Sequence, residues 1–268
     1  MGDKVISVIT VVYNDVENIE RSLLDTIAQS YKDLELIVID GGSTDGTVDV
    51  LKKYSSKIIW LSEKDKGIYD AMNKGAKIAS GEWILYHNCG DFFSSNESIS
   101  EMFKTGVNED VCVLYGNCRF VNNYGYIDRI PPLSNPGYDL HMMPVFHPAA
   151  FIRTSYQKSH SYDLSYKSSA DYDFFIKCLK EGGKFEYRPT LVTNYSYGDG
   201  MSVANWLTVY KENRRVHISN GIHSETVFSF YLRIINTFLH NKAKKLLPKK
   251  FVENRMMQNL KKEGWILQ

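Results

Sequence analysis

Residues 5–13 read Val5-Ile6-Ser7-Val8-Ile9-Thr10-Val11-Val12-Tyr13, a nearly continuous run of β-branched and apolar side chains. Such a run is typical of a strand that is covered on both faces, as strands of a parallel sheet are. Strands are also predicted at 34–39, 57–61 and 82–86, with helices between the strands at about 14–29, 48–54 and 69–79. Because strand and helix alternate, we expect an α/β fold with a mainly parallel, Rossmann-like sheet flanked by helices.

Polar side chains follow each of the four predicted strands. They are Tyr13-Asn14, Asp40-Gly41, Glu63-Lys64-Asp65 and the stretch from Asn88 to Asp91. Ligands of such sheets bind beyond the carboxyl ends of the strands, so we expect these residues to meet at one binding edge.

The second part of the chain has a different pattern. The predicted strands are 111–115, 117–121, a short strand after the turn at 122–125, and 191–197. The segment 131–148 is rich in Pro, Asn and Gly and is expected to be a long loop, of a length that is often functional. A helix is predicted at 171–181, and from about residue 203 the chain is predicted to be helical.

The composition excludes some classes of protein. With 268 residues, 43% of them hydrophobic and 24% charged, the chain can form a substantial globular core. Its net charge of +1 argues against a uniformly basic nucleic-acid binder, so no nucleic-acid partner is expected. Four cysteines without CxxC spacing indicate reduced thiols, and neither a signal-peptide pattern nor an apolar run of about 20 residues is present. We therefore expect a cytoplasmic protein.

Basic residues accumulate near the end of the chain. Between 240 and 262 a single acidic residue, Glu253, stands against Lys242, Lys244, Lys245, Lys249, Lys250, Arg255, Lys261 and Lys262. A helix with basic and apolar sides could lie on an anionic membrane, here the inner face of the plasma membrane. The alternative is a helix face in contact with water alone, and the sequence leaves both open.

Two charged segments allow a structural and a functional interpretation. In the turn 40–47, Ser43 is predicted to cap the following helix, while Asp40 could accept a hydrogen bond from a base or ribose. In the loop 63–75, Asp70 and Lys74 have the spacing of a solvent-exposed i,i+4 pair. Alternatively, Asp65, Lys66 and Asp70 lie at a helix N-terminus that suits a phosphate-bearing ligand.

The stretch His87-Asn88-Cys89-Gly90-Asp91-Phe92-Phe93 combines soft and hard metal ligands. A zinc site would need further Cys or His ligands at zinc spacing, and the sequence offers no second cluster of them. Asp91 and Asn88 instead supply oxygen atoms, and Mg²⁺ or Mn²⁺ often needs only one or two carboxylates beside phosphate oxygens and water. His87 and Cys89 are therefore expected to face away from the ion.

A pair of aspartates opens the predicted helix at 171–181. Ser168 and Asp171 have the spacing of a capping box, which explains one aspartate but not Asp173. The functional interpretation is that one carboxylate is a general base, kept ionised by the helix N-terminus.

In this order, these motifs resemble glycosyltransferase family 2, whose members have the nucleotide-sugar-binding GT-A fold. The resemblance covers about residues 4–202 and rests on 7–14, 40–47, 63–75, 81–91, His147-Pro148 and 170–173. It implies a GT-A domain over 1–202 and a helical, basic C-terminal extension over 203–268.

The resemblance also implies roles for individual residues. The implied nucleotide-sugar site comprises Val12, Tyr13, Asn14, Asp40, Asp65, Asp70 and Asn88. Asp91 matches the metal-binding aspartate, and Asp171 matches the catalytic base. The implied acceptor site or lid comprises His147, Asp173, Gly200 and Ser202. The chain departs from the pattern at Gly41, where many relatives carry aspartate, and at Asn88 and Gly90, where a full DxD motif has aspartates.

The implied function is an inverting transfer of a hexosyl or N-acetylhexosaminyl group, assisted by Mg²⁺ or Mn²⁺. The expected donor is a UDP-sugar, and the expected acceptor is a saccharide or a polyprenyl-linked molecule in surface polysaccharide biosynthesis. One alternative is a nucleotidyltransferase, which would need a Gly-rich basic loop where Tyr13-Asn14-Asp15 stands. The other is a non-catalytic carbohydrate-binding protein, suggested by the incomplete DxD motif.

Overall fold

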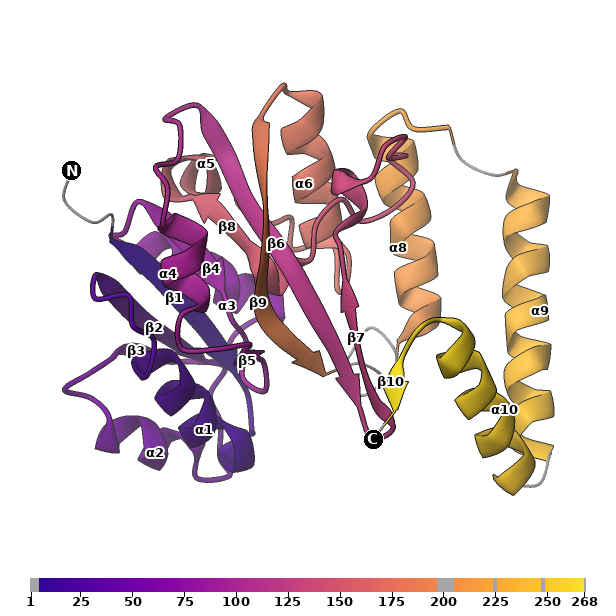
Figure 1. Cartoon of the computed structure of the whole chain (residues 1–268), viewed down its shortest axis with the longest axis horizontal. Coiled ribbons are helices and arrows are strands. Elements are labelled where there is room, and N and C mark those ends of the chain that lie inside the picture. Colours follow the sequence, from indigo (N-terminus) through magenta and orange to yellow (C-terminus); the bar gives the residue numbers. More distant parts are fainter. Residues whose placement is uncertain (1–4, 197–204, 224–225, 247–248, 268) are drawn as a thin grey trace.

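The structure, a computed structural model, describes residues 5–196, 205–223, 226–246 and 249–267. At its centre lies one mixed ten-stranded sheet (Figure 1). Eight strands follow the order β10-β7-β6-β8-β4-β1-β2-β3, while β9 pairs with β6 and β5 pairs with β9. The expected α/β fold is thus confirmed.

The N-terminal half is parallel, as the alternation predicts. Its strands are β1 (Ile6–Val12), β2 (Leu34–Asp40), β3 (Ile59–Ser62) and β4 (Trp83–Tyr86), and its helices are α1 (Val16–Ile27), α2 (Thr47–Lys53) and α3 (Ile68–Ile78). β1 lies between β2 and β4, and β3 lies outside β2. This order brings the carboxyl ends of β1, β2 and β4 to the same edge of the sheet.

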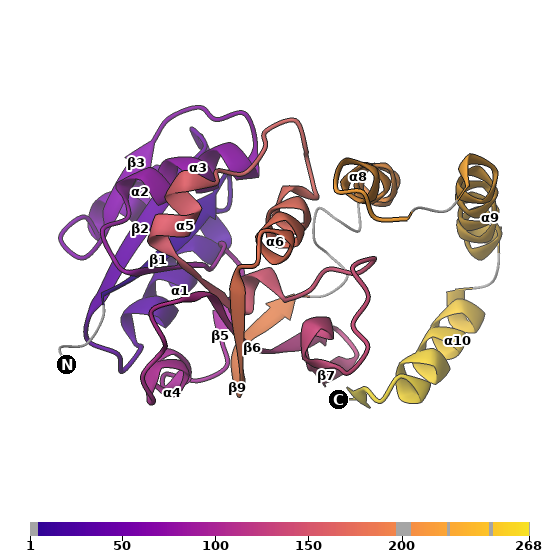
Figure 2. The ribbon, with the colours of Figure 1, turned by 90° about the horizontal axis from the view of Figure 1, so that it is seen from above.

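Both faces of β1 are buried, which is the physical reason for its apolar run. Val8 belongs to the same core cluster as Leu23 of α1. Ile9 belongs to the opposite cluster together with Met72 of α3. Alternate side chains of the strand therefore support two helical layers (Figure 2).

The second half of the sheet is mixed. It consists of β5 (Phe92–Phe93), β6 (Val111–Asn122), β7 (Gly125–Arg129), β8 (Ala150–Arg153) and β9 (Lys184–Ser196). β6 is antiparallel to β7 and β8 and parallel to β9. The two strands predicted at 111–115 and 117–121 are one strand, because Gly116 is not a turn. A Cβ at Gly116 would lie 2.6 Å from the carbonyl oxygen of Thr190, so the close approach of β9 requires glycine.

The remaining helices of this half cover the sheet or connect its strands. They are α4 (Ser98–Phe103), α5 (Thr154–Ser159) and α6 (Ala170–Lys180). The predicted loop 131–148 contains a short 3₁₀ turn (Pro132–Ser134), and a second one begins near its end (His147–Ala149).

Both predicted helix caps are wrong. α2 begins after Gly46, and the Ser43 hydroxyl instead donates to Asp40. α6 begins after Ser169, and no side chain caps its N-terminus. The backbone N–H of Ser168 donates to Glu212 from a later helix, so tertiary contacts replace the local box.

The C-terminal segment is helical from α8 (Trp206–Ser219) through α9 (Val227–Leu246) and α10 (Lys249–Lys262). In Figures 1 and 2, α6, α8 and α9 stand in a row, with α9 outermost. The chain then returns, and the short strand β10 (Ile266–Leu267) pairs with β7. Among the described residues, none of the helices is long and apolar enough to cross a bilayer.

Candidate active site

A cavity of about 1080 Å³ lies at the end of β4 and is also lined by the N-termini of α3 and α6 and by β6, β7 and β9. Four predicted site residues line it: Asn88, Asp91, His147 and Asp171. Residues from distant parts of the sequence therefore converge on one space.

Asp171 lies in the first turn of α6 at the wall of this cavity. Its Oδ1 accepts a hydrogen bond of 2.8 Å from the phenol of Tyr69, in the first turn of α3, and one of 3.0 Å from the N–H of Tyr172. Burial and the nearby Asp171 charge raise the pKa of Tyr69, so its hydroxyl stays a donor at neutral pH. Both bonds use Oδ1, so among the described residues Oδ2 remains available to a substrate hydroxyl.

His147 is buried at the same cavity. Its Nε2 lies 2.8 Å from the hydroxyl of Tyr162, and its ring stacks on Tyr86 with 5.2 Å between centroids. Burial lowers the pKa of His147, against the opposing effect of the Asp171 charge, so the ring is neutral at pH 7. A neutral, fixed imidazole shapes the wall; its predicted role near the acceptor stays a prediction.

Asp91 is almost fully buried behind β4, and burial raises its pKa to about 7. Asn88 lies three residues earlier, in the turn that follows β4. Its side-chain oxygen is buried and has no hydrogen-bond partner among the described residues. An anionic oxygen with little solvation and an unsatisfied neutral oxygen line one cavity. Both features are relieved by a cation, so these residues fit a divalent metal.

No group of three or more His, Cys, Asp or Glu side chains within the described ranges could enclose a metal. Phosphate oxygens and water would therefore complete the coordination, as is common for Mg²⁺. His87 lies in the core, where its ring stacks on Phe93 at 4.1 Å and its Nε2 lies 2.9 Å from the Thr193 hydroxyl. The thiol of Cys89 contacts Asp15 at 3.3 Å.

The other predicted nucleotide residues lie outside this cavity. Val12, Tyr13, Asn14 and Asp40 lie at the ends of β1 and β2, and Asp65 and Asp70 lie between β3 and the first turn of α3. Val12 is buried, whereas the Tyr13 side chain is 65% exposed. Asn14 has a left-handed backbone with φ of 48°, which asparagine tolerates. Its N–H donates to Ser43 at 2.7 Å and its side-chain oxygen accepts from the N–H of Thr44 at 2.8 Å. Asn14 thus joins the loops after β1 and β2.

Asp40 has no exposed surface, and its carboxylate holds the turn that follows β2. It accepts hydrogen bonds from the N–H groups of Gly42 and Ser43 and from the hydroxyls of Ser43 and Ser62. This arrangement gives Asp40 a structural role. Its direct contact with a nucleotide stays a prediction.

Asp65 and Asp70 stabilise the loop before α3. Asp65 accepts from the N–H of Gly67 at 2.8 Å, and Asp70 accepts from the N–H of Lys66 at 3.0 Å. Asp70 also forms the anticipated i,i+4 ion pair with Lys74, at 3.5 Å.

Comparison with known proteins identifies the family. A model described as Glycosyl transferase family 2 matches residues 7–159, which is more than half of the chain. The chain belongs to glycosyl transferase family 2. The resemblance drawn from the motifs is confirmed, and the protein is a glycosyltransferase.

Two named relatives of this glycosyltransferase align with different shares of the chain. The "PGL/p-HBAD biosynthesis glycosyltransferase" of Mycobacterium bovis (strain BCG / Pasteur 1173P2) is 30% identical over 188 residues, which cover 65% of this chain and 67% of that protein. The "Cholesterol galactosyltransferase" of Borreliella burgdorferi is 33% identical over 93 residues, which cover 34% of this chain and 26% of that protein.

Solved structures share the fold. The mannosyltransferase PcManGT from Pyrobaculum calidifontis, in complex with GDP-Man and Mn²⁺, has a TM-score of 0.65 at 14% identity. The alignment covers 83% of this chain and 66% of that chain. S. aureus TarS in complex with UDP-GlcNAc has a TM-score of 0.65 at 19% identity, covering 80% of this chain and 66% of that chain. This glycosyltransferase thus spans about two thirds of the length of these structures.

Two of the positions that depart from the family pattern, Gly41 and Gly90, have distinct local surroundings in this glycosyltransferase. A Cβ at Gly41 would lie 2.6 Å from Asp65 Oδ2 and 3.2 Å from the Tyr13 ring, so an aspartate there would require the Asp65 side chain to shift. Gly90 has φ of 92°, a left-handed conformation in which an aspartate would be strained.

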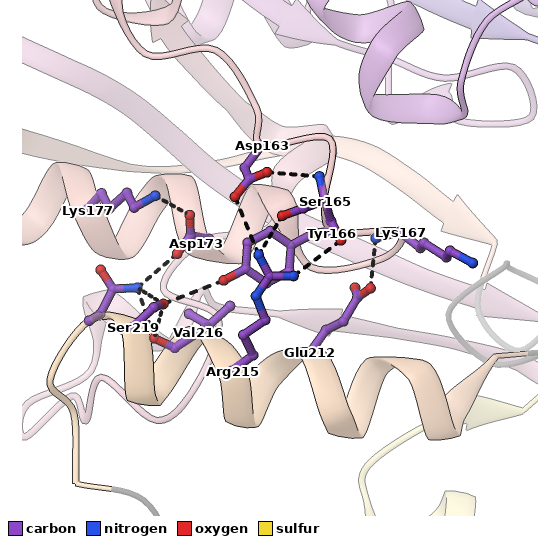
Figure 3. Close-up of polar contacts among 11 residues, drawn as sticks. Asp163, Ser165, Tyr166, Lys167, Asp173, Lys177, Glu212, Arg215, Val216 and Ser219 are labelled. Atoms are coloured by element: carbon purple, nitrogen blue, oxygen red, sulfur yellow. Dashed lines mark hydrogen bonds and ion pairs between the residues drawn. The ribbon is translucent and has the colours of Figure 1, made fainter.

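Asp173 does not lie at the cavity. It is buried between α6 and α8, where it pairs with Lys177 at 2.6 Å and accepts from Asn220 at 2.9 Å (Figure 3). Two residues along a helix correspond to about 200° of rotation, so Asp171 and Asp173 face opposite directions. Its predicted place beside the acceptor is therefore not supported. Gly200 and Ser202 lie outside the described residues.

Several cavity residues of the glycosyltransferase were not predicted. Tyr69 stands in the quoted loop 63–75, and its position in the first turn of α3 was the signal that it reaches the binding edge. Three cationic side chains also line the cavity: Arg21, Arg119 and Lys167. They come from α1, β6 and the segment before α6, and no local motif marks them.

Proposed function

We propose that this glycosyltransferase moves a sugar from a nucleoside-diphosphate sugar to an acceptor hydroxyl with inversion at the anomeric carbon. Asp171 takes the hydroxyl proton while that oxygen attacks, and the bond from the anomeric carbon to the diphosphate breaks in the same step. The observation that carries the proposal is the cavity itself. It holds Asp171, positioned by Tyr69, together with the buried oxygens of Asn88 and Asp91.

Asn88 and Asp91 would hold Mg²⁺ or Mn²⁺ together with the diphosphate of the donor. When bound, the ion would supply positive charge that stabilises the leaving diphosphate. Arg21 and Lys167 line the same cavity and would add positive charge beside the diphosphate, whereas Arg119, which also lines it, is paired with Asp128 at 2.6 Å.

The proposed donor is a UDP-sugar carrying a hexosyl or N-acetylhexosaminyl group. TarS, which is described with UDP-GlcNAc, supports UDP, whereas PcManGT, described with GDP-Man, makes GDP the alternative. The exposed Tyr13 and Asp65 beside Gly41 offer a ring and a carboxylate to a base. A thermal-shift series of UDP- and GDP-sugars distinguishes the two nucleotides.

The proposed acceptor is a saccharide or a polyprenyl-linked molecule in the assembly of a surface polysaccharide or glycolipid. The relative named cholesterol galactosyltransferase supports an acceptor with a lipid part. Apolar side chains, among them Phe120, Val145 and Phe146, line one part of the cavity and suit such a part.

The decisive experiment compares Asp171→Asn with Asp173→Asn. Both changes remove one carboxylate from the same helix and keep its shape. Asp171→Asn should lower turnover by about 10³-fold, the range typical of general-base catalysis, while the donor still binds in a thermal-shift assay. Asp173→Asn should keep turnover within about threefold and lower only the melting temperature, because the buried carboxylate loses its ion pair with the half-exposed Lys177. Normal turnover of Asp171→Asn would refute the assignment.

A further inference from the structure

α9 presents an exposed apolar face. Seven of its large apolar side chains are between 49% and 74% exposed: Val227, Phe228, Tyr231, Leu232, Ile235, Phe238 and Leu239. At 100° per residue these positions fall within an arc of about 140° on one side of the helix. A single apolar stripe of this size on a helix surface is typical of a binding face.

The opposite side of α9 fixes its orientation. Phe230 is buried, and the Arg214 guanidinium of α8 lies 5.3 Å from the centre of its ring. The Arg233 guanidinium of α9 lies 4.8 Å from the Tyr210 ring of α8. α9 is the outermost helix of the row α6, α8, α9 (Figures 1 and 2). Because Phe230 and Arg233 contact α8, the exposed stripe on the other side of α9 points away from α8.

α10 differs from α9 in this respect. Leu260 of α10 is buried with Ile127 and Trp265, and Met256 and Met257 pack against the same cluster. The apolar side of the basic segment 240–262 is therefore partly used by the β6–β7 hairpin. The exposed apolar face lies on α9, earlier in the chain than the sequence indicates.

Within α9 itself, all charged side chains are positive. α9 contains no acidic residue, and the exposed Lys242 follows the stripe on the same side of the helix. The chain continues with Lys244, Lys245, Lys249 and Lys250. A second copy of α9 would oppose these cations with no carboxylate of its own, whereas an anionic lipid surface supplies the complementary charge.

We infer that α9 lies in the headgroup region of an anionic bilayer, with its stripe inserted among the acyl chains and its basic end against the lipid phosphates. Aromatic and aliphatic side chains on one face with lysines beside them are the features of a helix that lies on a membrane rather than crossing it. Its length of 20 residues agrees with this mode, since many helices that lie on membranes have 20 to 30 residues.

Membrane binding by α9 would position the cavity relative to the bilayer, because α8 is hydrogen-bonded to the segment before α6 (Figure 3). Glu212 of α8 accepts hydrogen bonds of 2.8 Å from the N–H groups of Lys167 and Ser168. Arg215 of α8 donates to the carbonyl of Ser165 at 3.2 Å. Asp171 lies in the first turn of α6, directly after this segment. If α9 is bound to the membrane beside α8, the proposed base is therefore held at a fixed distance from lipid-linked molecules.

The test is flotation of the whole protein with vesicles of phosphatidylcholine and phosphatidylglycerol, and with vesicles of phosphatidylcholine alone. The wild type should float with the anionic vesicles, and less in high salt. The triple variant Phe228→Ser, Ile235→Ser, Phe238→Ser should lose at least tenfold of this binding. The control Leu24→Ser, Ile27→Ser, Ile59→Ser removes three exposed apolar side chains from α1 and β3 and should bind like the wild type.

A second variant tests the charge separately. Lys242→Gln keeps the stripe and should weaken binding to the anionic vesicles by about fivefold, with no effect on phosphatidylcholine alone. Melting temperatures show that each variant is folded, and turnover with a water-soluble acceptor should be unchanged in all of them. Absence of wild-type flotation, or equal flotation of both triple variants, would overturn the inference. So would a wild-type dimer in sedimentation that the α9 variant loses, since the stripe would then bind a second copy.

Discussion

Asp91 and Asp171 are two carboxylates of one cavity in different surroundings. Asp171 accepts two hydrogen bonds at a helix N-terminus, which stabilise a negative charge. Asp91 is almost buried, and burial raises its pKa to about 7. In the proposed function Asp171 is the base, and Asp91 is the carboxyl that gains most from a cation.

Replacing Asp91 with Asn should stabilise the metal-free protein, and more so at pH 8 than at pH 5. Unfolded aspartate ionises near pH 4 and folded Asp91 near pH 7, so the folding cost of this carboxyl grows between these values. Above pH 7 the cost is complete and amounts to up to about 4 kcal/mol. Urea denaturation with a chelator at both pH values measures the difference.

The control is Asp33→Asn, which changes an exposed aspartate away from the cavity and should alter the free energy of unfolding by less than about 0.5 kcal/mol. With Mn²⁺ the order should reverse, because only the wild type is stabilised by the ion. If the Asp91→Asn protein is no more stable than the wild type at pH 8, burial of the ionised Asp91 carboxylate does not destabilise the metal-free protein, and this explanation is wrong.

Tyr69→Phe tests the positioning of Asp171. Loss of the phenol bond frees the carboxylate to rotate, so kcat should fall by about tenfold while KM for the donor is unchanged. Tyr54→Phe, which removes an exposed hydroxyl bonded to Glu20, is the control and should leave both constants unchanged. A change in KM alone would indicate that Tyr69 serves donor binding instead.

At the scale of elements, the paired strands β6 and β9 decide the second half of the fold. The sequence indicates a break at Gly116, where the structure has one continuous strand of twelve residues. Gly116 is required by the neighbouring backbone of Thr190, a contact between residues far apart in sequence. The local sequence pattern contains no information on such a contact, which explains why two strands were predicted in place of β6.

Gly116→Ala should therefore lower the free energy of unfolding by about 1–3 kcal/mol, because the added methyl group collides with the Thr190 carbonyl. Gly106→Ala is the control, since a Cβ at Gly106 meets nothing within 4 Å. Urea denaturation of both variants gives the comparison. Equal stability of the two variants would show that the backbone of β9 near Thr190 can shift to make room for the methyl group.

At the scale of the whole molecule, the alternation of strands and helices predicted the parallel half of the sheet. Asn88, Asp91, His147 and Asp171 converge on one cavity, although Asp171 comes from a helix 80 residues beyond Asp91. Asp173 was predicted at the acceptor site, whereas it lies between α6 and α8. The sequence of a helix N-terminus does not indicate which side of the helix faces the cavity. The antiparallel insertion of β8 between β4 and β6 and the return of β10 to β7 depend on tertiary contacts alone.

The stereochemistry of the transfer tests the central claim most directly. If Asp171 assists a single displacement at the anomeric carbon, an α-linked nucleotide sugar gives a β-linked product. Proton NMR of the first product formed, before any equilibration, reports the anomeric coupling constant. We predict the β configuration, and an α-linked product would contradict a single displacement with Asp171 as base.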